Sequence, residues 1–310
     1  MELALVEGGV GLPFRVANNE QMGSKEKLWC ESCSDQKKYL LKYARLNTGE
    51  DWAEKIASEL AGKSGLDLPH AVVDLATHDG RVAVLAHNFL DAEGRLVHGN
   101  ELLFERDPAY PAEEVRRVPQ HTLNNVLQVL TEVKCPASAN LPAEVVSSAE
   151  LYCGYLVLDA LIANTDRHHE NWGIVIQRGE GGSRLLTLAP TYDHGSSLGR
   201  ELLDEARRKK LETTDKHADL AAYADRARSA FYRKAEDAKP LGTFDLVALA
   251  AETHGPAVRA WIMRARKAAA GGSFRDIIAK VPTSRMTLTA KEFASRLLEY
   301  NFTKLVSLLN

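Results

Sequence analysis

The chain has 310 residues, of which 45% are hydrophobic and 26% are charged. This composition supplies enough apolar material for a sizeable core, in about two domains or one two-lobed unit, and it excludes a globally disordered chain. The 39 basic and 42 acidic residues give a formal net charge of −3, which argues against a dedicated nucleic-acid scaffold. We therefore expect no direct binding of nucleic acid.

Cysteine content and apolar runs bear on the compartment. Four cysteines are too few for a secreted domain built on disulfides. The first segment carries Glu2 and Glu7 and no basic residue before its apolar stretch, unlike a secretory signal. The longest apolar run, residues 151–163, contains Asp159 and is too short to span a membrane. We expect a cytoplasmic protein that does not bind membranes.

The first part of the chain has the pattern of strands with a single helix. Apolar stretches between turn signals predict four strands, at residues 27–30, 38–44, 71–76 and 81–89. A helix is predicted from about residue 51 to residue 63, because Trp52, Ile56 and Leu60 recur at four-residue spacing. Residues 1–90 are therefore predicted to form a small β-rich lobe.

From residue 101 onward the spacing of apolar residues is helical. Residues 123–130 and the nearly all-apolar residues 143–163 predict two helices, the second buried on most sides. Residues 173–177 and 184–188 flank a glycine-rich turn and predict a hairpin. Three amphipathic helices are predicted after the hairpin, at residues 215–235, 243–270 and 289–309. Residues 91–310 are thus predicted to form a larger, mainly helical lobe.

The segment most informative about function follows the buried helix directly. Residues 163–173, ANTDRHHENWG, place Asp166 and Asn171 in one short polar connection, and such loops commonly carry function. A hairpin brings its two ends together, so Asp193 in the segment TYDHGSS should return beside these residues. Two acids and an amide supply oxygen ligands of the kind that a site for Mg²⁺ and phosphate requires.

The spacing of these three residues is typical of phosphoryl transfer. Protein kinases use a loop aspartate that accepts the proton of the substrate hydroxyl, an asparagine five residues on, and a second aspartate after a hairpin. Asp166, Asn171 and Asp193 meet that arrangement. We predict that Asp166 is the catalytic base and that Asn171 and Asp193 hold Mg²⁺ on ATP.

The order Asp-Arg-His-x-x-Asn and the segment around Asp193 resemble the HipA-type kinases and their lipid-kinase-like relatives. The resemblance extends into the first part of the chain. Ser24 and Lys25 lie in the segment GSKEK, which resembles the phosphate loop of that family. Lys42 looks like the strand lysine that contacts the nucleotide phosphates, and Glu54 stands where the ion-pair partner of this lysine would be.

The resemblance implies a two-lobed, protein-kinase-like α+β fold with ATP between the lobes. Residues 89–99, FLDAEGRLVHG, resemble the hinge, so His87 and Phe89 would lie beside the adenine. His168 would order the catalytic loop next to ATP. The resemblance also implies autophosphorylation of Ser24, in a short form without the extra N-terminal subdomain of longer HipA proteins.

These features together predict an ATP- and Mg²⁺-dependent HipA-like Ser/Thr protein kinase. The resemblance implies a toxin of a toxin–antitoxin pair, with a translation component such as an aminoacyl-tRNA synthetase as substrate and a helix-turn-helix antitoxin as partner. The alternatives are a lipid or small-molecule kinase and a non-catalytic module that binds an antitoxin or DNA complex. A metal-dependent phosphohydrolase using His168, His169 and His194 is less favoured, because adjacent histidines point in different directions.

The lysine and its acidic partner leave alternatives open. A lysine that ends an apolar strand is often a surface residue whose stem alone is buried, so Lys42 need not contact nucleotide. Glu50, Asp51 and Glu59 lie on the same predicted helix as Glu54 and could replace it as the ion-pair partner.

Two further patterns have no assigned role. Cys30 and Cys33 form a C-x-x-C pair, but Cys135 and Cys153 do not form the second close pair that a zinc site needs, so the first pair is interpreted as incidental. The basic run at residues 207–210 is interpreted as a solvated helix face, with docking of an acidic or RNA-bound substrate as the alternative.

Overall fold

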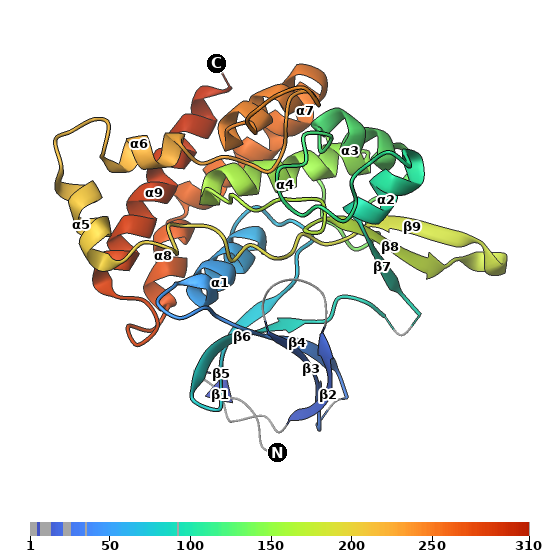
Figure 1. Cartoon of the computed structure of the whole chain (residues 1–310), viewed down its shortest axis with the longest axis horizontal. Helices are drawn as coiled ribbons and strands as arrows, with labels where there is room; N and C mark the ends of the chain where they lie inside the picture. The colour runs from blue at the N-terminus through green and yellow to red at the C-terminus, as the bar shows by residue number, and fades with distance from the viewer. Residues whose placement is uncertain (1–4, 7–13, 21–25, 35, 92, 310) are drawn as a thin grey trace.

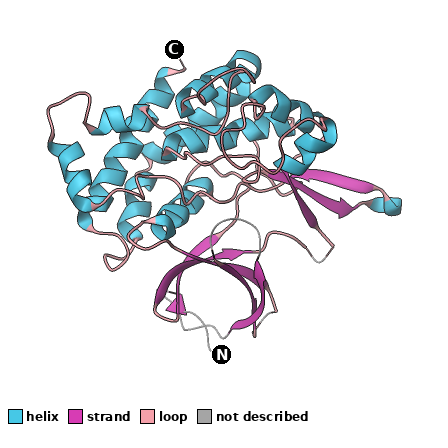
Figure 2. Cartoon of the chain, in the orientation of Figure 1, coloured by secondary structure: helices cyan, strands magenta, loops and turns pink. Residues whose placement is uncertain are grey.

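The computed structural model describes residues 5–6, 14–20, 26–34, 36–91 and 93–309, and they fold into two lobes (Figure 1). The smaller lobe is a six-stranded antiparallel sheet with one helix. The larger lobe is mainly helical and carries a three-stranded sheet at one side (Figure 2). The predicted α+β architecture, with a β-rich first lobe and a helical second lobe, is confirmed.

The strands of the small lobe pair in the order β1-β5-β6-β4-β3-β2, and the sheet is strongly curved (Figure 1). These strands are β1 (Leu5–Val6), β2 (Phe14–Glu20), β3 (Lys27–Ser32), β4 (Lys38–Tyr43), β5 (Val73–His78) and β6 (Arg81–His87). The turn between β5 and β6 contains Asp79 and Gly80, both with positive φ, as the sequence signal for a tight turn predicts. Strand β6, the last strand of the small lobe, ends at His87, and the chain then passes to the large lobe.

Helix α1 (Glu50–Ala61) joins β4 to β5 and packs between the lobes. Its predicted stripe, Trp52, Ile56 and Leu60, is fully buried. The helix contacts β5 and β6 of the small lobe as well as α4 and α8 of the large lobe. Side chains on α1 are consequently positioned by both lobes at once.

Helix α4 (Ser148–Ile162) is the centre of the large lobe. A capping box of Ser147 and Glu150 begins it, and 13 of its 15 residues are buried. It packs mainly against α7 and α9. The other helices and strands of this lobe are α2 (Gly99–Arg106), α3 (Leu123–Val129), α5 (Asp204–Glu212), α6 (Leu220–Asp225), α7 (Thr243–Ala270), α8 (Ser273–Lys280), α9 (Leu288–Ser307), β7 (Arg95–His98), β8 (Gly173–Arg178) and β9 (Arg184–Leu188). No helix within the described part of the chain is long and apolar enough to cross a membrane.

The helix predicted at residues 215–235 is wrong. Only the six residues of α6 are helical there, and the backbone that follows pairs with a distant segment. The amide of Ser229 donates to the carbonyl of Leu241, and the amide of Leu241 donates to the carbonyl of Phe231. Phe231 is completely buried beside His121 and Tyr152. Tertiary packing thus overrides the local helical preference of this segment.

The basic run at residues 207–210 lies on α5 and is only partly a solvated face. Arg208 and Lys209 are exposed, whereas Arg207 is buried. Arg207 donates to the carbonyl of Gly199, and its guanidinium lies 5.5 Å from the ring centroid of Trp52 on α1. This arginine stabilises the contact between α5 and α1.

Candidate active site

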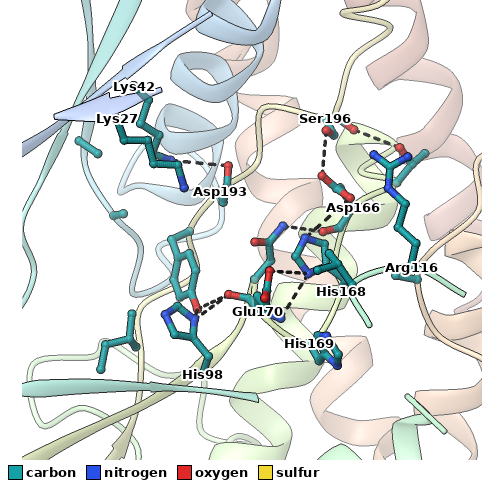
Figure 3. Close-up of a pocket in the computed structure, with 18 of the residues that line it drawn as sticks. Lys27, Lys42, His98, Arg116, Asp166, His168, His169, Glu170, Asp193 and Ser196 are labelled. Carbon is teal, nitrogen blue, oxygen red and sulfur yellow. Dashed lines mark hydrogen bonds and ion pairs between the residues drawn. The ribbon is translucent and has the colours of Figure 1, made fainter. Parts of the chain in front are cut away.

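A cavity of about 1180 Å³ lies between the lobes and takes its walls from both. Pockets for small molecules commonly measure about 300–1,000 Å³, so the cavity exceeds the space that one such ligand needs. The predicted site residues that line it are Lys42, His87, Phe89, Asp166, His168, Asn171 and Asp193 (Figure 3 shows this region). Glu54 contacts Lys42 behind the wall. Ser24 and Lys25 lie outside the described residues.

Lys42 on β4 connects the two lobes electrostatically. Its Nζ lies 2.5 Å from Oε1 of Glu54 on α1. The same Nζ lies 3.6 Å from Oδ1 of Asp193 in the large lobe (Figure 3). The side chains of Lys42 and Glu54 are only 7% and 4% exposed. Burial alone would lower the pKa of Lys42, but Asp193 and Glu54 raise it above its ordinary value. The cavity therefore contains a buried ammonium group that stays charged.

Among the acids of α1, Glu54 is the one that pairs with Lys42, because the others have different partners. Ion pairs join Glu50 to Arg45 and Arg200, Asp51 to Arg285, and Glu59 to Lys55. The register of α1 explains this division. Glu54 faces the sheet beside β4, whereas Asp51 meets the large lobe and Glu59 lies on the exposed side.

The loop that carries Asp166 begins with a left-handed residue. Ala163 follows α4 with φ of 53° and turns the chain out of the helix. The amide of Asn164 then donates to the carbonyl of Asp159, and the side-chain oxygen of Asn164 accepts from the amide of Asp166. These bonds fix the backbone of Asp166 relative to the buried helix.

A buried ion pair forms the framework of the same loop. Arg167 is 1% exposed and makes two bonds of 2.7 Å to the carboxylate of Asp159. Its guanidinium also donates to the carbonyl of Asn171 at 2.6 Å, to Oγ1 of Thr191 at 2.9 Å and to the carbonyl of Tyr192 at 3.3 Å. One arginine thus joins α4, the loop and the segment that leads to Asp193.

Arg167 and Asp159 are functional residues that the sequence motifs do not identify. A signal was present, because Asp159 is a single acid in an otherwise apolar run and a buried carboxylate requires a partner. The identity of that partner depends on the fold, since Arg167 approaches Asp159 only after the chain reverses at Ala163.

Asp166, Asn171 and Asp193 all line the cavity. The carboxylate of Asp166 is partly exposed and accepts a hydrogen bond from Oγ of Ser196 at 3.2 Å. Nδ2 of Asn171 donates to the carbonyl of Asp166 at 2.7 Å, which leaves the amide oxygen as the acceptor of that side chain. Asp193 has φ of 56°, a conformation that costs a non-glycine residue about 1–3 kcal/mol and that is concentrated at functional sites.

The donor set fits a hard divalent cation. Asp193 offers a carboxylate and Asn171 an amide oxygen, and Mg²⁺ prefers such ligands while keeping phosphate oxygens and water in its shell. The histidines of this region are engaged elsewhere. Nδ1 of His169 lies 2.7 Å from the hydroxyl of Tyr110, and Nε2 of His194 lies 2.8 Å from Oγ1 of Thr191. These contacts favour structural roles for both rings over the ligand set of a phosphohydrolase.

The remaining predicted residues lie at two other parts of the wall. His87 ends β6, its Nε2 lies 2.8 Å from Oδ2 of Asp74, and Phe89 follows it at the connection between the lobes. Phe89 stacks on Tyr192, with ring centroids 6.0 Å apart. His168 lies beside Asp166 in the same loop, and burial lowers its pKa although three nearby carboxylates oppose the shift.

No protein-family model and no curated protein sequence matches the chain. Solved structures do match it. CtkA, a proinflammatory kinase of Helicobacter pylori, is similar with a TM-score of 0.71 and 20% identity, over 96% of this chain and 94% of that chain.

A second similar structure is HipA of Shewanella oneidensis MR-1, solved as a toxin–antitoxin complex with HipB and operator DNA. Its TM-score is 0.54 at 12% identity, over 93% of this chain and 64% of that chain. At these identities the likeness concerns the fold. The chain has the two-lobed, protein-kinase-like fold that the sequence predicts.

Proposed function

We propose that the protein is an ATP- and Mg²⁺-dependent protein kinase that transfers the γ-phosphoryl group of ATP to a serine or threonine hydroxyl. The observation that carries the proposal is one cavity between the lobes that gathers Lys42, Asp166, Asn171 and Asp193, with Glu54 directly behind the lysine. This is the set of groups that phosphoryl transfer between two bound substrates requires.

Each group has a distinct role in the proposed reaction. Lys42, which its two carboxylate neighbours keep charged, neutralises phosphate oxygens. Asn171 and Asp193 would hold Mg²⁺, which supplies charge neutralisation at the β- and γ-phosphates when bound. Asp166 orients the acceptor hydroxyl and takes its proton. The bond from the γ-phosphorus to its bridging oxygen breaks, the acceptor oxygen bonds to that phosphorus, and ADP leaves.

We further propose an antitoxin partner, a toxin role and a substrate for this kinase. The complex of HipA with HipB and operator DNA supports an antitoxin partner by structural analogy. A cytoplasmic location is proposed from the low cysteine content. The HipA-like toxin role and an aminoacyl-tRNA synthetase as substrate follow from the sequence resemblance. The same holds for nucleotide contacts and autophosphorylation in the segment with Ser24 and Lys25, and for adenine contacts of His87 and Phe89.

The test compares the wild type with Asp166→Ala and Asp193→Ala, using labelled ATP, Mg²⁺ and a mixture of protein and peptide acceptors. We expect label transfer by the wild type and its loss in both variants, with unchanged circular dichroism. Glu212→Ala, at an exposed acid on α5 that does not line the cavity, is the matched control and should transfer normally. Transfer that persists in either active-site variant contradicts the proposed kinase mechanism.

A further inference from the structure

The cavity continues beyond Asp166, on the side away from Lys42. In the view of Figure 3, Asp166 lies between Lys42 and Arg116, and all three line the same cavity. The proposed roles place the nucleotide phosphates near Lys42 and Asp193. The part of the cavity between Asp166 and Arg116 is therefore the space left for the acceptor. We call it the second part of the cavity.

The rim of this second part is a loop between α2 and α3 that carries two adjacent arginines. Arg116 and Arg117 are exposed, and no described residue forms an ion pair with either guanidinium. Glu113 and Glu114 lie in the same loop but do not line the cavity. Val118, which is buried, anchors the loop to the core. Two positive charges, with no ion-pair partner in the part of the chain that the structure describes, thus lie at the cavity entrance.

The backbone of the rim loop is strained at one of these arginines. Arg117 has φ of 57°, in the left-handed region that residues other than glycine, asparagine and aspartate seldom adopt. Such conformations persist where the surroundings enforce them, and they are concentrated at ligand-binding segments. The buried Val118 next in the chain supplies that enforcement here.

The inner wall of the second part carries no net charge. Its residues are at most 5% exposed, and they are Val118, His121, His169, Ser229 and Tyr232. Burial lowers the pKa of His121 to about 3, so this ring is neutral near pH 7. Nε2 of His169 is buried and has no hydrogen-bond partner among the described residues. A polar group of a bound acceptor would satisfy it.

We propose that this part of the cavity binds the phosphoacceptor and that the acceptor is an acidic polypeptide segment. Its serine or threonine enters beside Asp166, and carboxylates flanking that residue bind Arg116 and Arg117. The inference rests on the proposed kinase function and specifies its substrate class. A polypeptide is favoured over a small anion because both arginines are at the exposed rim, outside the neutral inner wall, where only flanking groups of a longer acceptor reach them.

The charges that line the cavity have both signs. The carboxylates of Asp166, Glu170 and Asp193 repel an acidic acceptor, whereas the side chains of Lys27, Lys42, Arg45 and Arg200 attract it. Arg116 and Arg117 offset this repulsion at the entrance. Because both arginines are exposed, we expect them to act in the initial capture of the acceptor. Their attraction for its carboxylates should weaken as the salt concentration rises.

The experiment measures transfer to serine peptides of one length whose flanking residues are glutamate, alanine or lysine. We expect the wild type to prefer the glutamate peptide, mainly through a lower KM. The double variant Arg116→Glu/Arg117→Glu should raise the KM for that peptide by about 10-fold or more and reverse the order of preference. The shift in melting temperature caused by Mg²⁺ and ATP should persist in this variant, which shows that the nucleotide site is intact.

The control is Arg266→Glu/Lys267→Glu, which changes the same charge at an exposed adjacent pair on α7 outside the cavity. It should leave the peptide preference unchanged. Preference for lysine or alanine peptides in the wild type, or an unchanged preference in the Arg116/Arg117 variant, overturns the inference while the kinase function stands. Phosphorylation of small anionic alcohols but of no peptide also overturns it. The mixed-acceptor assay with Asp166→Ala decides the kinase function separately.

Discussion

At the scale of single residues, Asp166 is held by a chain of polar contacts that reaches the small lobe. Oγ of Ser196 donates to Oδ2 of Asp166 at 3.2 Å and accepts from Nη2 of Arg200 at 3.1 Å. Nη1 of Arg200 lies 2.8 Å from Oε1 of Glu50 on α1, which also pairs with Arg45. Since Arg200 can only donate, the hydroxyl proton of Ser196 is directed at Asp166. Ser196 is therefore a positioning residue for the proposed base.

Replacing Ser196 by alanine should lower kcat by about 10–100-fold, which corresponds to the 1.5–3 kcal/mol typical of a hydrogen bond to a charged group. The KM for ATP should change little, because Ser196 does not contact the groups that hold the nucleotide. Ser196→Thr keeps the hydroxyl and should recover most of the rate. Steady-state kinetics of the three proteins checks this, and an unchanged kcat in Ser196→Ala would show that the contact is not used in catalysis.

At the scale of elements, α1 is joined to the C-terminal helices by one buried arginine. Arg285, in the loop between α8 and α9, contacts Asp51 through Nε at 2.8 Å. Its Nη2 donates to the carbonyls of Ala76 and Ala83, each at 2.9 Å, at the ends of β5 and β6. Burial raises the pKa of Asp51 although this arginine opposes the shift. The position of α1, and with it Glu54, depends on this contact with the large lobe.

Arg285→Ala removes one member of a buried pair and leaves the Asp51 carboxylate without it, so the free energy of unfolding should fall by about 3–5 kcal/mol. Limited proteolysis should then cut the small lobe first. The matched control is Arg275→Ala, because Arg275 pairs with Glu299 at 2.5 Å on the surface, where solvent screens the pair and the expected loss is much smaller. Denaturant unfolding of both variants gives the comparison. Equal losses in the two would show that Arg285 does not stabilise the lobe contact.

The elements that the sequence predicts correctly are those with local causes. The stripe of Trp52, Ile56 and Leu60 follows from helical spacing, and the run around Asp159 is apolar enough to require burial on any fold. The helix expected at residues 215–235 fails because its backbone bonds are made to Leu241 and neighbouring residues, which no local pattern reveals.

At the scale of the whole molecule, the candidate site also combines features with local causes and features that depend on tertiary contacts. The proximity of Asp166, Asn171 and Asp193 could be predicted from the sequence, because one short loop and one hairpin determine it. The choice of Glu54 among four acids depends on how α1 rotates against the sheet, and the contacts of Arg116 with the cavity depend on the path of a loop without a sequence signal. Chemistry encoded in one segment is visible in the sequence, whereas chemistry assembled across segments requires the fold.

Three buried histidines make the stability of the whole molecule depend on pH. His121, His169 and His194 are each at most 3% exposed, and burial lowers the pKa of all three, to about 3 for His121 and about 4 for His169. In the unfolded chain a histidine has a pKa near 6.5. Below that pH the unfolded state binds protons that the folded state does not, so the free energy of unfolding falls as pH falls.

Each of these histidines should remove up to about 1.4 kcal/mol of stability per pH unit below 6.5, down to its folded-state pKa. Carboxylates change the free energy of unfolding little between pH 6.5 and 5.0, because most of them titrate near pH 4 in the unfolded chain. Urea unfolding followed by tryptophan fluorescence at several pH values from 7.5 to 5.0 measures the slope. His121→Gln should reduce the slope of the free energy of unfolding against pH by the contribution of one bound proton. His217→Gln, at an exposed histidine, should leave that slope unchanged. Stability that stays level from pH 6.5 to 5.0 would contradict the neutral, buried state of these rings.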